Sequence, residues 1–316
     1  MMRRAVRTWP MAGAVAVTLW VTAFTLSAQG LGSVARPPAA PAQAAAQAPA
    51  RGLLWKVDRD GRQAWLVGSL HLLPPDFYPL PDSLERAFAA SDALMEEVDL
   101  DSADDPAVAR TILSKAMNPP GVTLSSQLSK ESLAAVTGLL SKAGLPISML
   151  EQMKPWMVSM TLQALALQRI GFDPALGIDK HFADAAKRTR KPLLPLETVV
   201  EQIDFLDGLN PTTQDRMLRE TIEALDTEMT QVREIAAAWR AGDAAAMERV
   251  TLADMKDAPD VYELLLAGRN RRWVPQIEGC MQTYRSCFVV VGAAHLIGSD
   301  GVPTLLKARG YTITQQ

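Results

Sequence analysis

The amino-acid sequence predicts an α/β fold with α+β character, in which small mixed β-sheets end in GxxH motifs and a largely helical middle section surrounds them. Two matching segments support this prediction: Trp65-Leu-Val-Gly68-Ser-Leu-His71-Leu and Phe288-Val-Val-Val-Gly292-Ala-Ala-His295-Leu. Each begins with an apolar run typical of a buried strand, and the glycine then allows the backbone to turn at the strand end. The chain contains only three histidines, and two of them occupy the same place in these segments. We therefore expect both at strand ends, where α/β folds usually carry their chemistry.

The first strands of the fold are expected to form a hairpin. Leu54–Val57 and Ala64–Val67 flank Asp58-Arg-Asp-Gly61, a pattern typical of a β-hairpin with glycine in its turn. After several prolines, Asp82 is the expected N-cap of a helix, and Glu85 takes the capping-box position three residues later.

A third strand is predicted over residues 93–100, where acidic and apolar residues alternate. Glu97 and Asp99 would share one face of this strand, and Glu96 would point to the opposite face. On a solvated edge strand such carboxylates would only aid solubility. Because this strand comes directly after the unit formed by the Gly68 segment and the helix at Asp82, the pair is a candidate partner of His71.

Residues from about 105 to 275 have largely helical patterns. Gly177-Ile-Asp179 should open one helix, with Asp179 as a possible cap, and a short strand over 192–196 should end at Glu197. A late helix over 262–273 carries Arg269 and Asn270 among further arginines, a cluster that could equally be a solvated face. The chain should close with a helix over 302–309 and a strand over 311–314.

The first 28 residues have the pattern of a signal peptide. Arg3, Arg4 and Arg7 precede an uncharged stretch that ends in the small residues Ser27-Ala28. An uncleaved membrane anchor is the alternative, since the apolar run is nearly long enough to span a bilayer. Residues 29–50 are rich in alanine and proline and are expected to be a disordered linker, which leaves 51–316 as the folded domain. We therefore expect a periplasmic protein, anchored to the membrane only if the segment is uncleaved.

Composition and the cysteines limit the function further. A net charge of −3 over 316 residues gives no reason to expect nucleic-acid binding. Cys280 and Cys287 are the only cysteines, and in an oxidising compartment they are good candidates for a disulfide. Their spacing is unlike that of a zinc finger.

Two histidines and nearby carboxylates have two chemical uses. With Glu97 or Asp99, they could bind one divalent ion that activates a water molecule. Without metal, one histidine could act as a general base, with Arg269 stabilising the developing oxyanion. The sequence lacks the H-E-x-x-H, G-x-S-x-G and P-loop motifs, so the corresponding enzyme classes are not indicated.

Over nearly all of residues 53–315 the chain resembles the TraB/GumN family (TraB/PrgY/GumN), which includes the Tiki metalloproteases. The resemblance rests on dispersed and ordered motifs: Leu54-Trp-Lys, Gly68-Ser-Leu-His71, Phe77-Tyr-Pro-Leu-Pro81, Glu97-Val-Asp99, Lys154-Pro-Trp156, Gly177-Ile-Asp179, Leu196-Glu197, Arg269-Asn270 and Gly292-Ala-Ala-His295-Leu-Ile-Gly298.

The resemblance implies a fold of the erythromycin-esterase/ChaN-like type and a metal-dependent hydrolase. His71, His295 and Glu97 would be the metal-binding residues, and Glu97 would also act in catalysis. Glu197 would be a base or fourth ligand, and Arg269 and Asn270 match further polar positions of the site. From this we expect an exported hydrolase, most simply a peptidase, that uses Mn, Co or Zn and acts on a peptide or protein substrate. The alternatives are a metal-independent hydrolase with a histidine base and a non-catalytic binding protein of the cell envelope. If the metal hypothesis is right, His71 and His295 must share one site.

Overall fold

The structure is a computed structural model that describes residues 50–225, 228–253, 255 and 258–316. The signal peptide and almost all of the linker predicted for residues 1–50 lie outside the described residues. Among the helices of the described part, none is long and apolar enough to cross a membrane.

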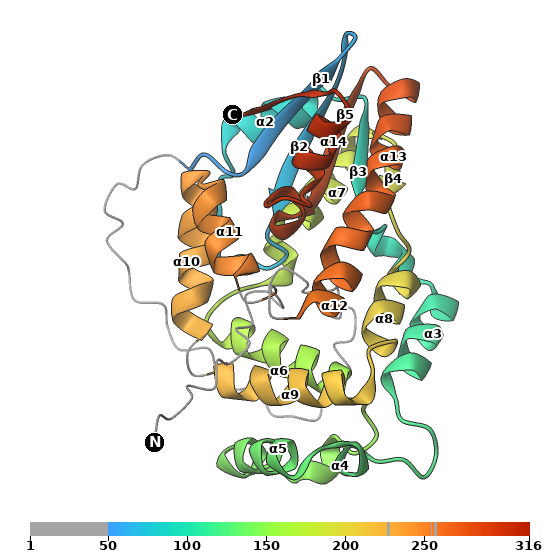
Figure 1. The fold of residues 1–316 in the computed structure, drawn as a ribbon, viewed down its shortest axis with the longest axis vertical. Coiled ribbons are helices and arrows are strands. Elements are labelled where there is room, and N and C mark those ends of the chain that lie inside the picture. Colours follow the sequence, from blue (N-terminus) through green and yellow to red (C-terminus); the bar gives the residue numbers. More distant parts are fainter. Residues whose placement is uncertain (1–49, 226–227, 254, 256–257) are drawn as a thin grey trace.

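Six strands form one mixed sheet in the order β4-β3-β5-β2-β1-β6 (Figure 1). Their bounds are β1 Leu54–Arg59, β2 Arg62–Ser69, β3 Ala93–Glu96, β4 Leu193–Pro195, β5 Ser286–Gly292 and β6 Thr312–Gln315. The four neighbours β4, β3, β5 and β2 run parallel, whereas β1 pairs antiparallel with β2 and with β6. The predicted α/β class is confirmed, and the strands gather in a single sheet.

The helices account for most of the remaining chain. Their bounds are α2 Asp82–Ala89, α3 Pro106–Ala116, α4 Leu124–Gln127, α5 Lys130–Lys142, α6 Pro155–Arg169, α7 Ile178–Thr189, α8 Val199–Asp207, α9 Pro211–Ala224, α10 Glu228–Ala241, α11 Ala244–Leu252, α12 Pro259–Tyr262, α13 Gly268–Thr283 and α14 Val302–Ala308. A π-helical turn, Glu263–Ala267, joins α12 to α13.

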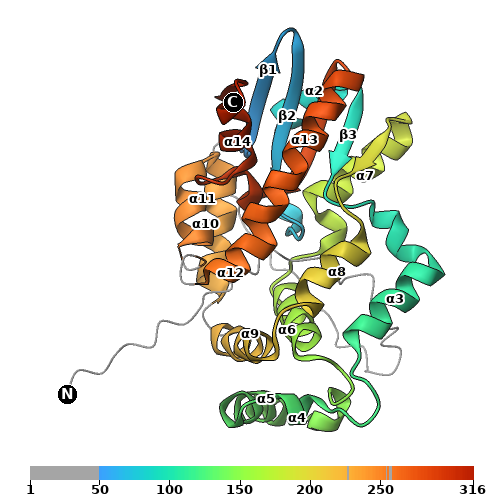
Figure 2. The same cartoon turned by 45° about the vertical axis from the view of Figure 1, so that its right-hand side comes forward.

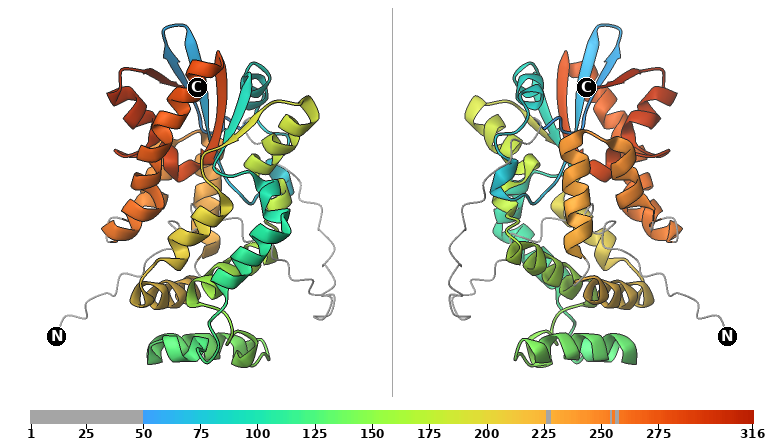
Figure 3. Two further views of the ribbon diagram at one scale, coloured as in Figure 1. Left: turned by 90° about the vertical axis from the view of Figure 1, so that its right-hand side faces the viewer. Right: turned by 90° about the vertical axis from the view of Figure 1, so that its left-hand side faces the viewer.

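Helices cover both faces of the sheet. In the left view of Figure 3, α13 and α14 lie on one face, and α2 and α7 lie on the other. Phe88, Phe182 and Phe288 bind α2 and α7 to the sheet, with ring centroids 4.7 to 5.4 Å apart. Figure 2 shows α4, α5, α6 and α9 stacked beyond the lower end of the sheet, which is the end where β2, β3 and β5 finish. The carboxyl ends of these parallel strands therefore point towards a layer of helices.

The predicted hairpin is confirmed. Leu54 pairs with Val67 and Arg59 with Arg62, and the tight turn contains Asp60 and Gly61, both with positive φ. Gly68, however, stays inside β2 and does not turn the chain. A Cβ there would lie 3.2 Å from the Cα of Ala293, so the glycine allows the chain after β5 to approach closely. The Gly68 motif thus serves the packing of two neighbouring strands.

Two further local predictions were wrong. Helix α2 begins at Asp82 itself, because Pro81 keeps an extended backbone as its N-cap, so Asp82 lies in the first turn. Strand β3 ends at Glu96, which pairs with Pro195 at the end of β4. Asp99 therefore does not continue the strand beside Glu97. Its carboxylate caps a short turn by accepting a hydrogen bond from Asp101 N at 3.1 Å.

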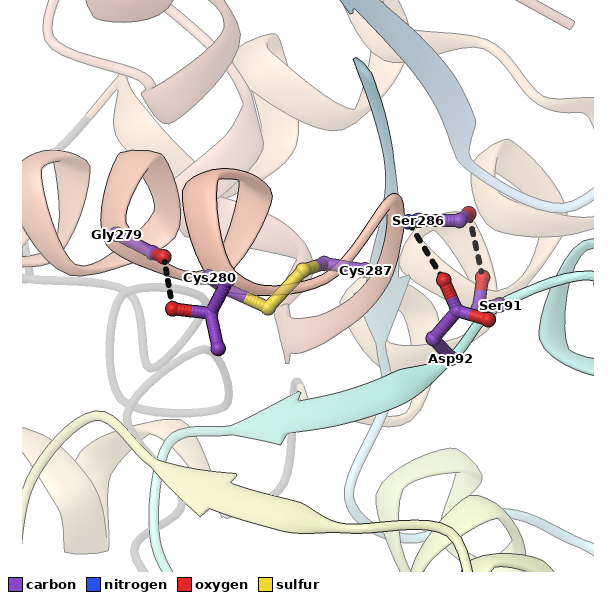
Figure 4. Close-up of a disulfide and its surroundings, with 7 residues drawn as sticks. Ser91, Asp92, Gly279, Cys280, Ser286 and Cys287 are labelled. Atoms are coloured by element: carbon purple, nitrogen blue, oxygen red, sulfur yellow. Dashed lines mark hydrogen bonds between the residues drawn. A yellow bond between two sulfur atoms is a disulfide. The ribbon is translucent and has the colours of Figure 1, made fainter.

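A disulfide joins Cys280 to Cys287, as the sequence predicts (Figure 4). It connects the end of α13 to the start of β5, and both cysteines are buried. On the other side of β5, Ser286 N donates to Asp92 Oδ2 at 3.1 Å, which fixes the strand start next to β3. The disulfide therefore holds together the helix that carries Arg269 and the strand that leads to His295.

Candidate functional site

Four of the predicted site residues follow four neighbouring parallel strands. Glu197, Glu97, His295 and His71 come shortly after β4, β3, β5 and β2, which is also the order of these strands across the sheet. Because the carboxyl ends of parallel strands meet at one edge, these side chains share that edge. Open α/β sheets usually bind ligands there.

Arg269, on helix α13, contacts three of these four residues. It is 1% exposed. Its Nη2 donates to Glu97 Oε2 at 2.7 Å, and its Nε donates to Glu197 Oε2 at 2.9 Å. Its Nη1 lies 3.2 Å from His295 Nε2 and also donates to the carbonyl of Leu265. The guanidinium is thus the centre of a buried charged network, which we call the arginine cluster: Arg269, Glu97, Glu197 and His295.

Glu97 is held as a carboxylate within this cluster. Its Oε1 accepts a hydrogen bond from Gly292 N at 2.7 Å, and its Oε2 accepts another from Gln202 Nε2 at 3.0 Å. Burial alone would raise the pKa of Glu97, but Arg269, followed by His295, His71 and the Gly292 amide, lowers it to about 2. Glu97 is therefore ionised at neutral pH.

His295 is held as a neutral ring. Asn270 donates its Nδ2–H to the carbonyl of Asp300 at 2.8 Å, so its Oδ1 faces the histidine and accepts from Nδ1 at 2.5 Å. That tautomer leaves Nε2 to accept from Arg269. The ring is fully buried and packs on Trp273, with centroids 4.3 Å apart. Burial, with Arg269 and His71, lowers the pKa of His295 to about 3 against the attraction of Glu97.

His71 has a different environment. It follows β2, the parallel strand farthest from β4 in the sheet. Its Nδ1 lies 3.2 Å from Asp179 Oδ2, and Ser69 Oγ donates to the other oxygen of Asp179 at 2.8 Å. Burial would lower the pKa of His71, but Asp179, and more weakly Glu97, raise it above 6.5. We call Ser69, His71 and Asp179 the histidine–aspartate group.

Asp179 does not act as the helix cap that its sequence position suggested. Helix α7 has Gly177 as its N-cap, and no side chain caps it. A Cβ at Gly177 would collide with the carbonyl oxygen of His71, and Ile178 N donates to the carbonyl of Leu70. The helix start therefore packs directly against the loop after β2, and this turns the Asp179 carboxylate towards the histidine.

The structure places most of the site residues that the sequence singled out in one of two groups that follow neighbouring strands of the sheet. His71, His295, Glu97, Glu197, Arg269 and Asn270 all belong to the two groups or contact them directly. Sequence reasoning missed Asp179 as a partner of His71, and Gln202 as a partner of Glu97. The only signal for Asp179 was its place in the Gly177-Ile-Asp179 motif. Asp99, the alternative to Glu97, is not part of either group.

The expected metal ligands do not fit a metal ion in this arrangement. Both nitrogens of His295 and both oxygens of Glu97 are engaged by protein groups, and the Arg269 guanidinium adds a positive charge beside them. Within the described ranges, no three His, Cys, Asp or Glu side chains are grouped so that they could hold an ion. The metal itself stays a prediction from the family resemblance.

Comparisons with known proteins cover the same part of the chain as the motifs identified in the sequence. Residues 53–315 match the model of the TraB/PrgY/gumN family. The chain belongs to this family. Two relatives, each named "uncharacterized protein YbaP", come from Shigella flexneri and Escherichia coli (strain K12). Each is 28% identical over 246 residues, which cover 78% of this chain and 88% of the relative. No solved structure matches. All the residues of both groups lie within the range matched by the TraB/PrgY/gumN model.

Proposed function

We propose that this chain is a hydrolase that cleaves peptide bonds with His71 as its general base. The observation that carries the proposal is the contact of His71 with Asp179, whose second oxygen is held by Ser69. A carboxylate at Nδ1 orients the ring and stabilises its protonated form, as in other histidine bases. Nε2 is then the nitrogen that accepts the proton.

The proposed reaction needs one water molecule and one histidine. His71 takes a proton from the water, and the oxygen attacks the carbonyl carbon of the substrate. The C–N bond then breaks as His71 returns the proton to the leaving amine. Glu97 supports this cycle, because its negative charge favours the imidazolium that forms on His71.

The arginine cluster has a positioning role in this proposal. Every nitrogen of the Arg269 guanidinium already has a partner in Glu97, Glu197, His295 or the Leu265 carbonyl. Arg269 therefore suits the task of fixing the carboxylates better than that of binding a substrate oxyanion. The peptide as substrate class comes from the resemblance to the Tiki proteases.

Chelation separates the three functions that the sequence allows. Purified protein is incubated with a mixture of quenched fluorescent peptides, with excess EDTA and with added Mn, Co or Zn, alongside His71→Asn. Hydrolysis that survives EDTA and is lost in His71→Asn supports the proposal. Hydrolysis that EDTA abolishes and a metal restores would replace it with the metal-dependent enzyme. Absence of hydrolysis in all conditions, with a stable envelope partner recovered by His71→Asn, would replace it with the binding protein.

A further inference from the structure

A polar hollow lies beside the tip of the β1–β2 hairpin, at the upper end of the molecule in Figure 1. Its volume of about 530 Å³ falls within the range of about 300–1,000 Å³ that is usual for ligand sites. We call it the hairpin hollow. Three arginines line it together with one amide, one thioether and one phenol: Arg59, Arg62, Arg309, Gln282, Met281 and Tyr311. Two carboxylates, those of Asp60 and Glu278, complete the lining.

The hairpin hollow is separate from the site proposed above. Arg62 is the first residue of β2, and His71 follows Ser69, the last residue of this strand. Because a strand rises about 3.3 Å per residue, the length of β2 places the hollow roughly 23 Å from that site. The hollow therefore has no part in the reaction proposed for His71.

Two of the three arginines in the lining are paired with carboxylates. Arg309 donates through Nε and Nη2 to the two carboxyl oxygens of Glu278, each at 2.7 Å. Arg59 Nε lies 3.5 Å from Asp60 Oδ2, and the Arg59 guanidinium lies 5.1 Å from the centroid of the Tyr311 ring. Arg59 Nη1 also donates to the carbonyl of Arg309 at 3.1 Å. These contacts fix two guanidinium groups in the wall of the hollow.

The third arginine, Arg62, is available to a ligand. Within the part of the chain that the structure describes, the side chains of Arg62 and Gln282 have no hydrogen-bond or ion-pair partner. Three arginines and two carboxylates leave the lining with one net positive charge, and Arg62 carries it. The hollow therefore offers one unmatched cation and one amide to a bound molecule.

From these observations we infer that the hairpin hollow binds the phosphate group of a small phosphorylated ligand, with Arg62 as its main contact and Gln282 as its second. A guanidinium donates two parallel N–H groups to a phosphate, in a geometry that lysine does not provide. A carboxylate has only two oxygens, which one guanidinium can satisfy. The additional oxygens of a phosphate can also accept from the N–H groups of Arg59 and Arg309 that have no partner. The volume leaves room for the rest of a small ligand beside Met281 and Tyr311.

Isothermal titration calorimetry of the purified protein tests whether the ligand is recognised through its phosphate. The probes are glucose 6-phosphate, inorganic phosphate and glucose. Glucose 6-phosphate should bind at one site per chain with a dissociation constant below about 1 mM, inorganic phosphate should compete with it, and glucose should not bind. If neither phosphate compound binds this tightly, or if glucose binds as tightly as its phosphate ester, the inference is wrong.

Three variants locate the bound phosphate. Arg62→Gln removes the unmatched charge and should weaken the binding of glucose 6-phosphate about 10- to 100-fold, the range for lost hydrogen bonds to a charged group. Gln282→Glu adds a negative charge to the wall and should weaken it as well. The control is Arg110→Gln, because Arg110 is an exposed residue of α3 and its replacement changes the net charge equally. Equal dissociation constants for Arg62→Gln and Arg110→Gln would mean adventitious anion binding and would overturn the inference. Circular dichroism shows whether the three variants fold.

Vesicles distinguish a lipid headgroup from a soluble ligand. Phosphatidylcholine vesicles with and without phosphatidic acid, whose headgroup is a phosphomonoester, are sedimented with wild type and with Arg62→Gln. Sedimentation that needs both phosphatidic acid and Arg62 assigns the hollow to a lipid headgroup. Binding of glucose 6-phosphate without sedimentation assigns it to a soluble phosphate. Because none of these measurements depends on peptide hydrolysis, the phosphate site can fail while the hydrolase proposal stands, and the reverse.

Discussion

His71 and His295 occupy the same place in two matching sequence segments, but their surroundings drive their pKa values apart. Asp179 and Glu97 raise the pKa of His71 above 6.5 in spite of its burial. Deeper burial and the neighbouring Arg269 lower the pKa of His295 to about 3. A shared motif therefore determines where a side chain lies at the sheet edge, whereas its charge depends on the helix that packs against it. For His71 that helix is α7, and for His295 it is α13.

The contrast predicts that the two histidines differ most in catalysis. His71→Asn should lower kcat/KM for peptide hydrolysis by about 10²–10⁴-fold, the usual contribution of a general base. The loss should fall mainly on kcat, because Asn keeps the size of the site but cannot take a proton. Steady-state kinetics on a fluorescent peptide measures it. The matched control is His181→Asn, since His181 contacts Glu85 at 2.7 Å and belongs to neither group. Equal losses in the two variants would remove His71 from the role of base.

The second prediction concerns protonation directly. In an NMR titration the ring of His71 should change charge above pH 6.5, and the ring of His295 should stay neutral down to about pH 3, a separation of at least three pH units. The consequences for stability have opposite signs. The His71 contribution is present below pH 6.5 and is lost as the pH rises through its folded-state pKa. The His295 contribution is lost as the pH falls from 6.5 towards 3, because the unfolded chain then binds a proton that the folded chain excludes. Two rings that titrate together would contradict the comparison.

The third prediction concerns the stability of the arginine cluster. Arg269→Met should lower the free energy of unfolding by about 3–5 kcal/mol, because it leaves the buried Glu97 without its counter-charge and Glu197 with Arg272 alone. Urea unfolding measures the change. Arg272→Met is the control, since the Arg272 side chain is 53% exposed and contacts only the rim of the cluster at Glu197. We expect it to cost less than about 1 kcal/mol. If the two variants are equally stable, the cluster does not hold the sheet edge together.

The sequence predicted more of the fold than of the charge distribution. The hairpin, the strand before Glu197 and the helix over 302–309 were predictable because their signals are local. A shared site for His71 and His295 was expected only under the metal hypothesis, and the structure places the two residues after the parallel neighbours β2 and β5. The contact between Asp179 and His71 was not, because it depends on how closely α7 can approach the loop after β2 at Gly177. Nor could the sequence tell that Arg269 pairs with residues 172 and 72 positions away along the chain.

The disulfide offers a fourth test, confined to the His295 side of the site. Cys280→Ala combined with Cys287→Ala should lower the free energy of unfolding by roughly 2–3 kcal/mol, the loop-entropy estimate for so short a loop. The measurement is urea unfolding with and without a reducing agent. Reduction should reproduce most of the loss in the wild type and have no effect on the double variant. A reducing agent that leaves the wild type unchanged would contradict the prediction.

The last test concerns Glu96, the final residue of β3 and the chain neighbour of Glu97. Glu96 is 1% exposed, and neither of its carboxyl oxygens has a hydrogen-bond partner among the described residues. Burial raises its pKa well above 4.5, and the negative charges of Asp179 and Asp99 raise it further against the opposing effect of Lys187. Two adjacent glutamates thus differ as the two histidines do: Glu97 is ionised and Glu96 keeps its proton.

This difference determines how stability should change with pH in Glu96→Gln. Above pH 4.5 the unfolded chain loses the Glu96 proton while the folded chain keeps it, so wild-type stability falls as the pH rises towards the folded-state pKa. The slope for one proton is at most about 1.4 kcal/mol per pH unit. Glutamine has no such proton, so the variant should match the wild type at about pH 4 and become the more stable of the two by about pH 7. Urea unfolding of both proteins across this range measures the difference. A constant difference at every pH would mean that folding does not raise the pKa of Glu96, and the contrast between the two adjacent glutamates would be lost.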